Sequence, residues 1–285
     1  MNNKVNIIYL LGAGRSGTTL LSTIINSHPN IKTIGEMHQF FEHNSLNKHC
    51  SCGEKLKNCE SWKPVIESLG FNELNFKEYD AITKSEERHK NTLKLLLGLK
   101  HNDKYLKLQN RVFETTQKHT KEEWLLDSSK YISRYLLLKR SNILNVKGIY
   151  VVRDVRGVIN SFSKKVQTPR KPISTIFYYL MINFFGELVY RLDRNVIKVK
   201  YEDFVKDPII ILDKIYSHVL EVEINNIGIQ DEYKMPHIIG GNRMKILKKV
   251  TIKNDNKWLI KIPRTKQILY AILAFPTMIL NKYRL

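Results

Sequence analysis

Short runs of apolar residues alternate along this chain with longer stretches of helical periodicity. We predict strands at Val5 to Leu11, Trp124 to Asp127, Ile149 to Arg153 and Val196 to Tyr201. A helical pattern follows each of them, which is typical of a parallel sheet covered by helices. The sequence therefore predicts an α/β fold with a central parallel sheet flanked by helices.

A long polar, basic and helix-prone region, about residues 37–120, separates the first two predicted strands. It carries no strand signal of comparable strength, so we predict a helical insertion that covers a substrate. No linker rich in Gly, Ser or Pro and no internal repeat divides the 285 residues. We therefore expect residues 1–285 to form one domain with this insertion.

Two apolar stretches come near the roughly 18 consecutive apolar residues that a membrane span needs, without reaching it. Residues 173–190 include Ser, Thr, Asn and Glu, so we predict a buried or groove-lining helix. Residues 268–280 have Lys or Arg on both flanks and Pro276 within them. The segment 262–285 therefore either packs against the domain or forms a basic amphipathic surface that lies on a membrane.

The chain is strongly basic, with 47 Lys and Arg against 27 Asp and Glu and a net charge of +20. Such a charge attracts anionic cofactors, polysaccharides, nucleic acid or lipid surfaces and does not rank them. The basic residues are spread along the chain without a known nucleic-acid-reading motif, so we predict no nucleic-acid partner. The apolar run before Gly12 is too short for a secretory signal, and we expect a cytoplasmic protein.

Three cysteines, Cys50, Cys52 and Cys59, lie in one short segment. An odd number does not suggest an extracellular disulfide framework. With His49 they would supply a Cys₃His zinc site, but C-x-C-x₆-C is not a usual finger spacing. The sequence favours reduced thiols and no metal ligands, with zinc as the open alternative.

The stretch "GAGRSGTT", residues 12–19, matches two phosphate-binding patterns. Gly12, Gly14 and Gly17 form the dinucleotide fingerprint G-x-G-x-x-G. Gly12, Gly17 and Thr19 also fit a P-loop in which Thr18 replaces the lysine. Both patterns place backbone N–H groups at a helix N-terminus, where an anion binds favourably.

Neither pattern is complete. A dinucleotide fold needs an acidic residue about 20 positions later, at the end of a second strand. Glu36 is at the right distance, but "NIKTIGEM" is a poor strand, which weakens the dinucleotide interpretation. An NAD(P)-binding oxidoreductase is therefore kept only as the alternative. The missing lysine argues against hydrolysis of a nucleoside triphosphate, because that charge meets the β- and γ-phosphates.

The stretch "GIYVVRDVRGVINSFSK" predicts a second phosphate site. Arg153 ends a buried strand and Ser161 follows about two helical turns later, so both side chains can meet one phosphate. The alternative is an Arg153–Asp154 ion pair and a solvated serine. Together with the glycine-rich loop, the pair suggests a nucleotide with phosphates at two separate positions.

These motifs resemble those of the sulfotransferases that use 3′-phosphoadenosine 5′-phosphosulfate (PAPS), including bacterial members. "GAGRSGTT" resembles their 5′-phosphosulfate loop and "VVRDVRGVINSF" their 3′-phosphate motif. "VKYEDFVKDP", "LLDSSKYISR", "CSCGEKLKNCESW" and the pair "HIIGGNRMKI" with "IKNDNKW" are similar to further family segments, in the same order. The resemblance, which runs from about Ile7 to Trp258, implies a P-loop-like nucleotide-binding core. The nucleotide-binding residues it implies are Gly14, Arg15, Ser16, Gly17, Thr18, Thr19, Arg153, Ser161, Tyr201, Asn242, Arg243 and Lys245.

The resemblance also implies the reaction. The sulfuryl group passes in line from PAPS to an acceptor hydroxyl, leaving 3′-phosphoadenosine 5′-phosphate (PAP), and no metal is required in principle. Arg15 and Lys130 are the candidates that take up charge on the leaving group. Glu36 is the candidate general base, with His38 and His28 as open alternatives.

The acceptor is the least constrained part. Tyr178, Tyr179, Phe184 and Phe185 would form an aromatic wall for a sugar or phenol, or belong to the core. By family analogy we expect a carbohydrate or glycolipid acceptor, with peripheral contact at the inner face of the membrane. The oligomeric state stays open, as does a relative that binds nucleotide or glycan without transfer.

Overall fold

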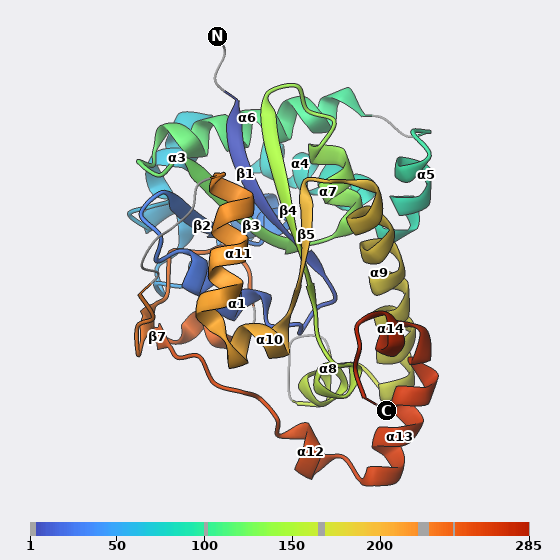
Figure 1. The fold of residues 1–285 in the computed structure, drawn as a ribbon. Helices are drawn as coiled ribbons and strands as arrows, with labels where there is room; N and C mark the ends of the chain where they lie inside the picture. Colours follow the sequence, from blue (N-terminus) through green and yellow to red (C-terminus); the bar gives the residue numbers. More distant parts are fainter. Residues whose placement is uncertain (1–3, 100–101, 165–168, 222–227, 242, 285) are drawn as a thin grey trace. The chain divides into compact units, whose positions relative to one another are not determined.

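The computed structural model describes residues 4–99, 102–164, 169–221, 228–241 and 243–284 (Figure 1). Five strands form a parallel sheet in the order β2-β3-β1-β4-β5, and helices flank it. Their bounds are β1 (Val5–Gly12), β2 (Ile31–Gly35), β3 (Trp124–Lys130), β4 (Leu144–Val152) and β5 (Val196–Lys200). The predicted fold class is confirmed.

The strand β2 corrects the sequence analysis, which found no good strand in "NIKTIGEM". Polar Lys32 and Thr33 interrupt its apolar run, and tertiary contacts supply the order instead. Asn26 Oδ1 accepts the Thr33 N–H at 2.7 Å, and Thr33 Oγ1 donates to Ser22 O at 2.8 Å. On the outer side of β2, the Ile239 N–H donates to the Ile34 carbonyl at 3.2 Å, so contacts from outside the sheet also hold this edge strand.

The strand order bears on the dinucleotide alternative. Glu36 does follow the second strand, as that alternative requires. However, β3 pairs in parallel with both β1 and β2 and therefore lies between them. In the dinucleotide fold the second strand is the direct neighbour of the first. The sheet therefore does not have the strand order of the dinucleotide-binding fold. The oxidoreductase alternative thereby loses its structural basis.

The chain divides into two compact units of interleaved segments. Unit 1 comprises Met1–Leu11, Thr19–Gly148 and Glu232–Val250, and unit 2 comprises Gly12–Thr18, Ile149–Asp231 and Thr251–Leu285. Helix α1 (Thr18–Ile25) follows the glycine-rich loop. This division does not test the prediction that residues 1–285 form a single domain, which stays a prediction.

Unit 1 contains the region 37–120, which is helical as predicted. The helices of this region are η1 (Met37–Gln39), α2 (Phe40–Ser45), η2 (Leu56–Asn58), α3 (Lys63–Leu69), α4 (Glu73–Glu86), η3 (His89–Asn91), α5 (Thr92–Leu96) and α6 (Asp103–Lys118). Unit 1 also contains α7 (Ile132–Leu138), β6 (Tyr233–Lys234), η4 (Arg243–Ile246) and β7 (Lys249–Val250). Asn72 and Asn75 form a capping box that starts α4. Helix α6 buries residues at the i, i+3, i+4 spacing of an amphipathic helix, among them Tyr105, Leu108 and Val112.

Unit 2 contains the C-terminal part of β4, β5 and seven helices within its described residues. They are α8 (Val155–Phe162), α9 (Pro172–Leu192), α10 (Tyr201–Lys206), α11 (Pro208–Leu220), α12 (Trp258–Lys261), α13 (Arg264–Leu273) and α14 (Phe275–Leu280). Helix α9 is long and apolar enough to cross a membrane by length and composition alone. It also packs on α8, β5 and α14, which fits the predicted buried or groove-lining helix (Figure 1).

Candidate active site

The glycine-rich loop at the end of β1 has a backbone shape that two of its glycines make possible. Gly12 and Gly17 have φ of 136° and 88°. A Cβ on Gly12 would lie 2.3 Å from the Val151 carbonyl oxygen, and one on Gly17 would lie 2.3 Å from the Tyr201 ring. Arg15 also has a left-handed φ of 71°, which costs a side chain about 1–2 kcal/mol. Strain of this kind is concentrated at binding sites.

The loop leaves a buried hydrogen-bonding group for a ligand. Ser16 is fully buried, and its hydroxyl has no hydrogen-bond partner among the described residues. Thr18 and Thr19 follow it as buried residues at the start of α1. A buried hydroxyl needs a hydrogen-bond partner, and an anionic oxygen bound at the N-terminus of α1 would accept from Ser16. The loop therefore fits a phosphate-like group.

Arg153 follows β4 directly and lies against this loop. Its Nη1 donates to the Arg15 carbonyl oxygen at 3.2 Å, and its guanidinium stacks 4.2 Å from the centre of the Tyr201 ring. A Cβ on Gly157 would lie 2.9 Å from Arg153 Nε, so the missing side chain makes room for the guanidinium. Unit 2 thus brings together the predicted Arg15, Arg153 and Tyr201.

The alternative pairing of Arg153 with Asp154 is wrong. Asp154 caps α8 by accepting the Arg156 N–H, and its carboxylate pairs with the Arg156 guanidinium at 2.7 Å. Arg156 also stacks 4.5 Å from the Trp258 ring. Because Arg156 occupies Asp154, the Arg153 guanidinium is not neutralised by its sequence neighbour.

Arg153 pairs instead with Asp255, through Nη2 and Oδ2 at 3.2 Å. Although partial burial would raise it, the pKa of the Asp255 carboxyl is lowered because Arg153 and Lys164 carry positive charge beside it. Carboxylates and phosphates bind arginine in the same way, so a bound phosphate could take the place of Asp255 on Arg153.

Ser161 lies in the last turn of α8 and is half-buried. Gly157 precedes it by four residues, so the two positions share one face of the helix. That is the face on which the Arg153 guanidinium lies. The predicted pair of Arg153 and Ser161 is therefore placed on one side of α8. Sequence reasoning missed Gly157, although "RDVRG" contained it.

Unit 1 brings Glu36 and Lys130 together. Glu36 follows β2, and its Oε1 pairs with Lys130 Nζ at the end of β3. Its Oε2 accepts from Gln39 Nε2 at 2.7 Å, and its backbone N–H donates to the Ile239 carbonyl at 2.7 Å. Lys130 has a left-handed φ of 73° and also donates to Ser128 O at 3.1 Å. Two residues singled out separately in the sequence thus form one partly buried ion pair.

A buried polar network holds the segment that carries this pair. Asp127 accepts Arg134 Nε at 2.9 Å, and its other oxygen accepts from Met37 N at 3.3 Å and from Ser129 N at 2.9 Å. Arg134 is fully buried and also pairs with Glu87. Since Met37 follows Glu36 directly, this network fixes the backbone beside the carboxylate. Sequence reasoning missed Arg134, whose partners are distant in the chain.

The two histidines kept open as bases differ in position. The His38 ring meets Gln39 Nε2 at 3.2 Å and contacts the Tyr131 ring at 4.6 Å between centroids. Burial lowers the pKa of His38, with the positive charges of Lys130 and Arg134 adding to the effect, so its ring is neutral. His28 follows α1 and precedes β2, so it lies at the opposite end of that strand from Glu36.

The other predicted nucleotide contacts belong to unit 1. Lys245 in η4 is half-buried, and burial lowers the pKa of its amine below the ordinary value. Arg243 is exposed at the start of η4. Asn242 lies outside the described residues. Contact of these residues with a 3′-phosphate stays a prediction.

The four aromatic residues of α9 do not form one wall. Tyr179 is fully buried and donates to the Arg153 carbonyl at 2.8 Å. Tyr178 accepts the Gly14 N–H at 2.9 Å, which ties the helix to the loop. Phe184 is 64% exposed and contacts Phe185 at 5.3 Å between ring centres. Two of the four therefore support the loop region, and Phe184 faces solvent.

Comparisons with known proteins identify the family of the chain. A family model described as the sulfotransferase family matches residues 8–224, a range that holds the loop, Glu36, Lys130, Arg153 and Tyr201. The chain belongs to the sulfotransferase family. No curated protein sequence matches it.

Solved sulfotransferase structures share the fold. The sulfotransferase domain of the Synechococcus PCC 7002 olefin synthase is similar with 19% identity and a TM-score of 0.55, over 100% of this chain and 97% of that one. The sulfotransferase domain from the curacin biosynthetic pathway is similar with 19% identity and a TM-score of 0.53, over 99% of both chains. At this identity the likeness concerns the fold.

Proposed function

We propose that this sulfotransferase moves the sulfuryl group of PAPS to an acceptor hydroxyl. The observation that carries the proposal is the arrangement in unit 2. There the loop, whose Ser16 hydroxyl has no hydrogen-bond partner in the described part of the chain, contacts Arg153, which stacks on the Tyr201 ring. This gives a nucleotide two separate anion-binding groups beside one aromatic ring. PAPS is a nucleotide of that kind, with a 5′-phosphosulfate and a 3′-phosphate.

Each group has a distinct task in this proposal. The loop amides and Ser16 hold the 5′ end, while Arg153 and Ser161 hold the 3′-phosphate. During transfer the bond between sulfur and the bridging oxygen breaks, and a bond from the acceptor oxygen to sulfur forms. Arg15 and Lys130 stabilise the negative charge that grows on the leaving phosphate.

Glu36 is the proposed general base, which accepts the proton of the acceptor hydroxyl. In this structure its carboxylate is held by Lys130 and Gln39. A lysine that turns to the leaving phosphate would release one carboxylate oxygen for the acceptor. The neutral His38 ring, bonded to the same Gln39 amide, is the second candidate base.

We propose a carbohydrate or glycolipid acceptor and a place at the inner face of a membrane. Helix α9 supports the membrane location with an exposed apolar stripe of Ile173, Phe177, Met181 and Phe184. Helix α13 adds exposed Ile268, Leu269, Ile272 and Leu273. Exposed Arg264 and Lys266 stand at the start of α13, and a basic, apolar surface of this kind suits an anionic lipid layer.

Calorimetric titration with PAP, the stable product, tests the nucleotide part of the proposal. We expect micromolar binding of PAP and little response to AMP or NAD. Arg153→Ala should weaken PAP binding by at least tenfold and Ser161→Ala by less, because an ionic contact is stronger than a neutral one. Absence of PAP binding, or a preference for NAD, would refute PAPS as the donor.

A further inference from the structure

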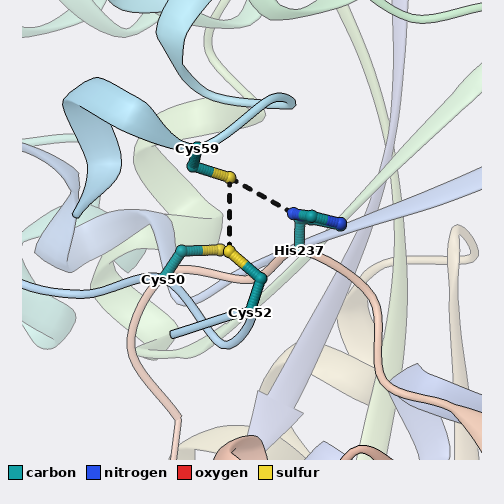
Figure 2. A group of neighbouring side chains, drawn as sticks. All are labelled: Cys50, Cys52, Cys59 and His237. Carbon is teal, nitrogen blue, oxygen red and sulfur yellow. Dashed lines mark hydrogen bonds between the residues drawn. The ribbon is translucent and has the colours of Figure 1, made fainter. Parts of the chain in front are cut away.

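Three cysteines and one histidine of unit 1 meet around a single point. The sulfur atoms of Cys50, Cys52 and Cys59 and a ring nitrogen of His237 all lie within 4.8 Å of one another (Figure 2). Cys52 Sγ is 3.7 Å from Cys59 Sγ, and Cys59 Sγ is 3.2 Å from His237 Nδ1. In a tetrahedral zinc site, bond lengths of about 2.0–2.3 Å place the ligand atoms roughly 3.3–3.8 Å apart. The cluster is close to that geometry.

We propose that Cys50, Cys52, Cys59 and His237 bind one zinc ion in a closed structural site. Three thiolates and an imidazole make a Cys₃His set, which zinc favours. All four tetrahedral positions are taken by protein, so the ion has no open position for chemistry. It would instead join two distant segments of unit 1.

Local backbone structure prepares the three thiols. The Cys50 N–H donates to Glu54 O at 2.8 Å, and the Gly53 N–H donates to Cys50 O at 3.1 Å. Gly53 has a φ of 95°, which allows the tight turn that directs Cys50 and Cys52 to one side. Cys59 ends η2, and Cys50 and Cys59 are both buried.

The His237 backbone is held against the cysteine segment by several hydrogen bonds. Ser51 Oγ accepts the Ile238 N–H at 2.9 Å and donates to Pro236 O at 2.5 Å. Trp62 Nε1 donates to the His237 carbonyl at 3.1 Å. The backbone that carries the imidazole is therefore held beside the cysteines on both sides of His237.

The second ring nitrogen of His237 identifies which atom would bind the metal. Nε2 lies 3.1 Å from Glu60 Oε1, while Nδ1 faces the sulfur atoms. Metal-binding histidines commonly donate their other N–H to a carboxylate, which fixes the tautomer and the ring orientation. Glu60 is thus a positioning residue for the imidazole.

His49, the fourth ligand considered from the sequence, has another partner. Its Nδ1 bonds the Gly53 carbonyl oxygen at 2.7 Å, and its backbone forms a bridge with Lys55. Sequence proximity therefore pointed to the wrong histidine. The histidine that meets the sulfurs is 178 residues from Cys59.

Metal content tests the site in the full chain. Protein purified under reducing conditions should carry about one zinc per chain by mass spectrometry of the elements. After exchange, cobalt(II) should give the visible bands of a tetrahedral thiolate site. Less than roughly 0.1 metal per chain after reconstitution with reductant, or a cobalt spectrum without thiolate bands, would overturn the proposal. So would a cysteine disulfide in the metal-free native protein.

Matched variants test the ligands. His237→Ala should lose most of the zinc, whereas His49→Ala should keep it; the reverse result would refute His237 as a ligand. If His237→Ala fails to fold, His237→Cys decides instead, because it should keep cobalt with an added thiolate band. An unchanged cobalt spectrum would contradict ligation by His237.

A gentler variant tests the positioning role. Glu60 is exposed, so Glu60→Ala should leave the fold intact and weaken zinc affinity about 10–100-fold. Glu67→Ala changes another exposed carboxylate, one that pairs with Lys63, and should leave the affinity unchanged. Equal effects of the two variants would contradict a specific role of Glu60.

Discussion

At the scale of single residues, the Glu36–Lys130 pair concentrates the proposed chemistry in one contact. The Glu36 side chain is 12% exposed, and both of its carboxylate oxygens are engaged. Its backbone is held by Ile239 and, through Met37, by Asp127. These contacts orient the carboxylate before any substrate binds.

Changing this carboxylate separates catalysis from binding. Glu36→Gln keeps the size of the side chain and removes the base, so sulfuryl transfer should fall at least 100-fold. PAP affinity should change less than threefold, because Glu36 does not hold the nucleotide in our proposal. Labelled PAPS turnover and PAP calorimetry measure the two effects. Normal turnover in Glu36→Gln would move the base to His38, and His38→Gln is then the deciding variant.

At the scale of elements, the glycine-rich loop joins β1 to α1 through backbone that side chains cannot follow. Gly17→Ala would combine left-handed strain with a clash on the Tyr201 ring. We expect it to destabilise the fold by about 2–4 kcal/mol in urea unfolding and to weaken PAP binding.

Gly70 supplies the matched control for this change. It has a left-handed φ of 62° at the end of α3, and a Cβ there would meet nothing within 4 Å. Gly70→Ala should therefore cost only about 1 kcal/mol. If the two variants were equally stable, the close packing of Gly17 on Tyr201 would be unimportant.

Helix α2 gives unit 1 a pH-dependent stability. Burial lowers the pKa of His43 to about 4, and the charges of Lys245 and Lys48 lower it as well. Between about pH 6.5 and 4 the unfolded chain binds a proton that the folded chain does not. Stability must therefore fall as the pH drops through this window, by roughly 1–2 kcal/mol between pH 7 and 5.

His43→Asn isolates this contribution. The amide can still donate to the Gln39 carbonyl, which accepts from His43 Nδ1 at 3.1 Å, but it does not titrate. Urea unfolding at pH 7 and pH 5 should show a smaller stability difference in the variant than in the parent. The same difference in both proteins would show that His43 does not couple folding to pH here.

The elements also show where sequence patterns suffice. Apolar runs mark β1, β3, β4 and β5, because each of these strands buries apolar residues in the core. β2 escapes this test since its order comes from Asn26, Ser22 and the Ile239 backbone. For the same reason the Glu36–Lys130 pair required tertiary structure, although each residue was predicted alone. Gln39 and Arg134 carry no motif and could not be found.

At the scale of the whole molecule, the net charge and the exposed apolar residues together predict binding to anionic lipid. With a net charge of +20 and exposed apolar residues on α9, the chain should sediment with vesicles of anionic phosphatidylglycerol and not with pure phosphatidylcholine. Added salt should reduce this binding. Phe177→Ser with Phe184→Ser should weaken it at least tenfold, because two exposed aromatic anchors are lost.

Leu74→Ser is the control for the vesicle test. Leu74 is 75% exposed in α4 of unit 1, outside the proposed lipid-binding surface. It should not change vesicle binding. Equal binding by the parent chain, the double variant and the control would refute a lipid contact through α9.

The interleaving of the two units has a consequence for how the chain is made. Unit 1 begins near the N-terminus but needs Glu232–Val250 for the Ile239 contacts with β2 and for His237. Cys59 leaves the ribosome 178 residues before that histidine, a delay of roughly 9–36 s at about 5–20 residues per second. Throughout this interval three neighbouring thiols lack their last partner and are open to oxidation. Redox conditions during translation should therefore govern the yield of folded protein more strongly than those met by the finished chain.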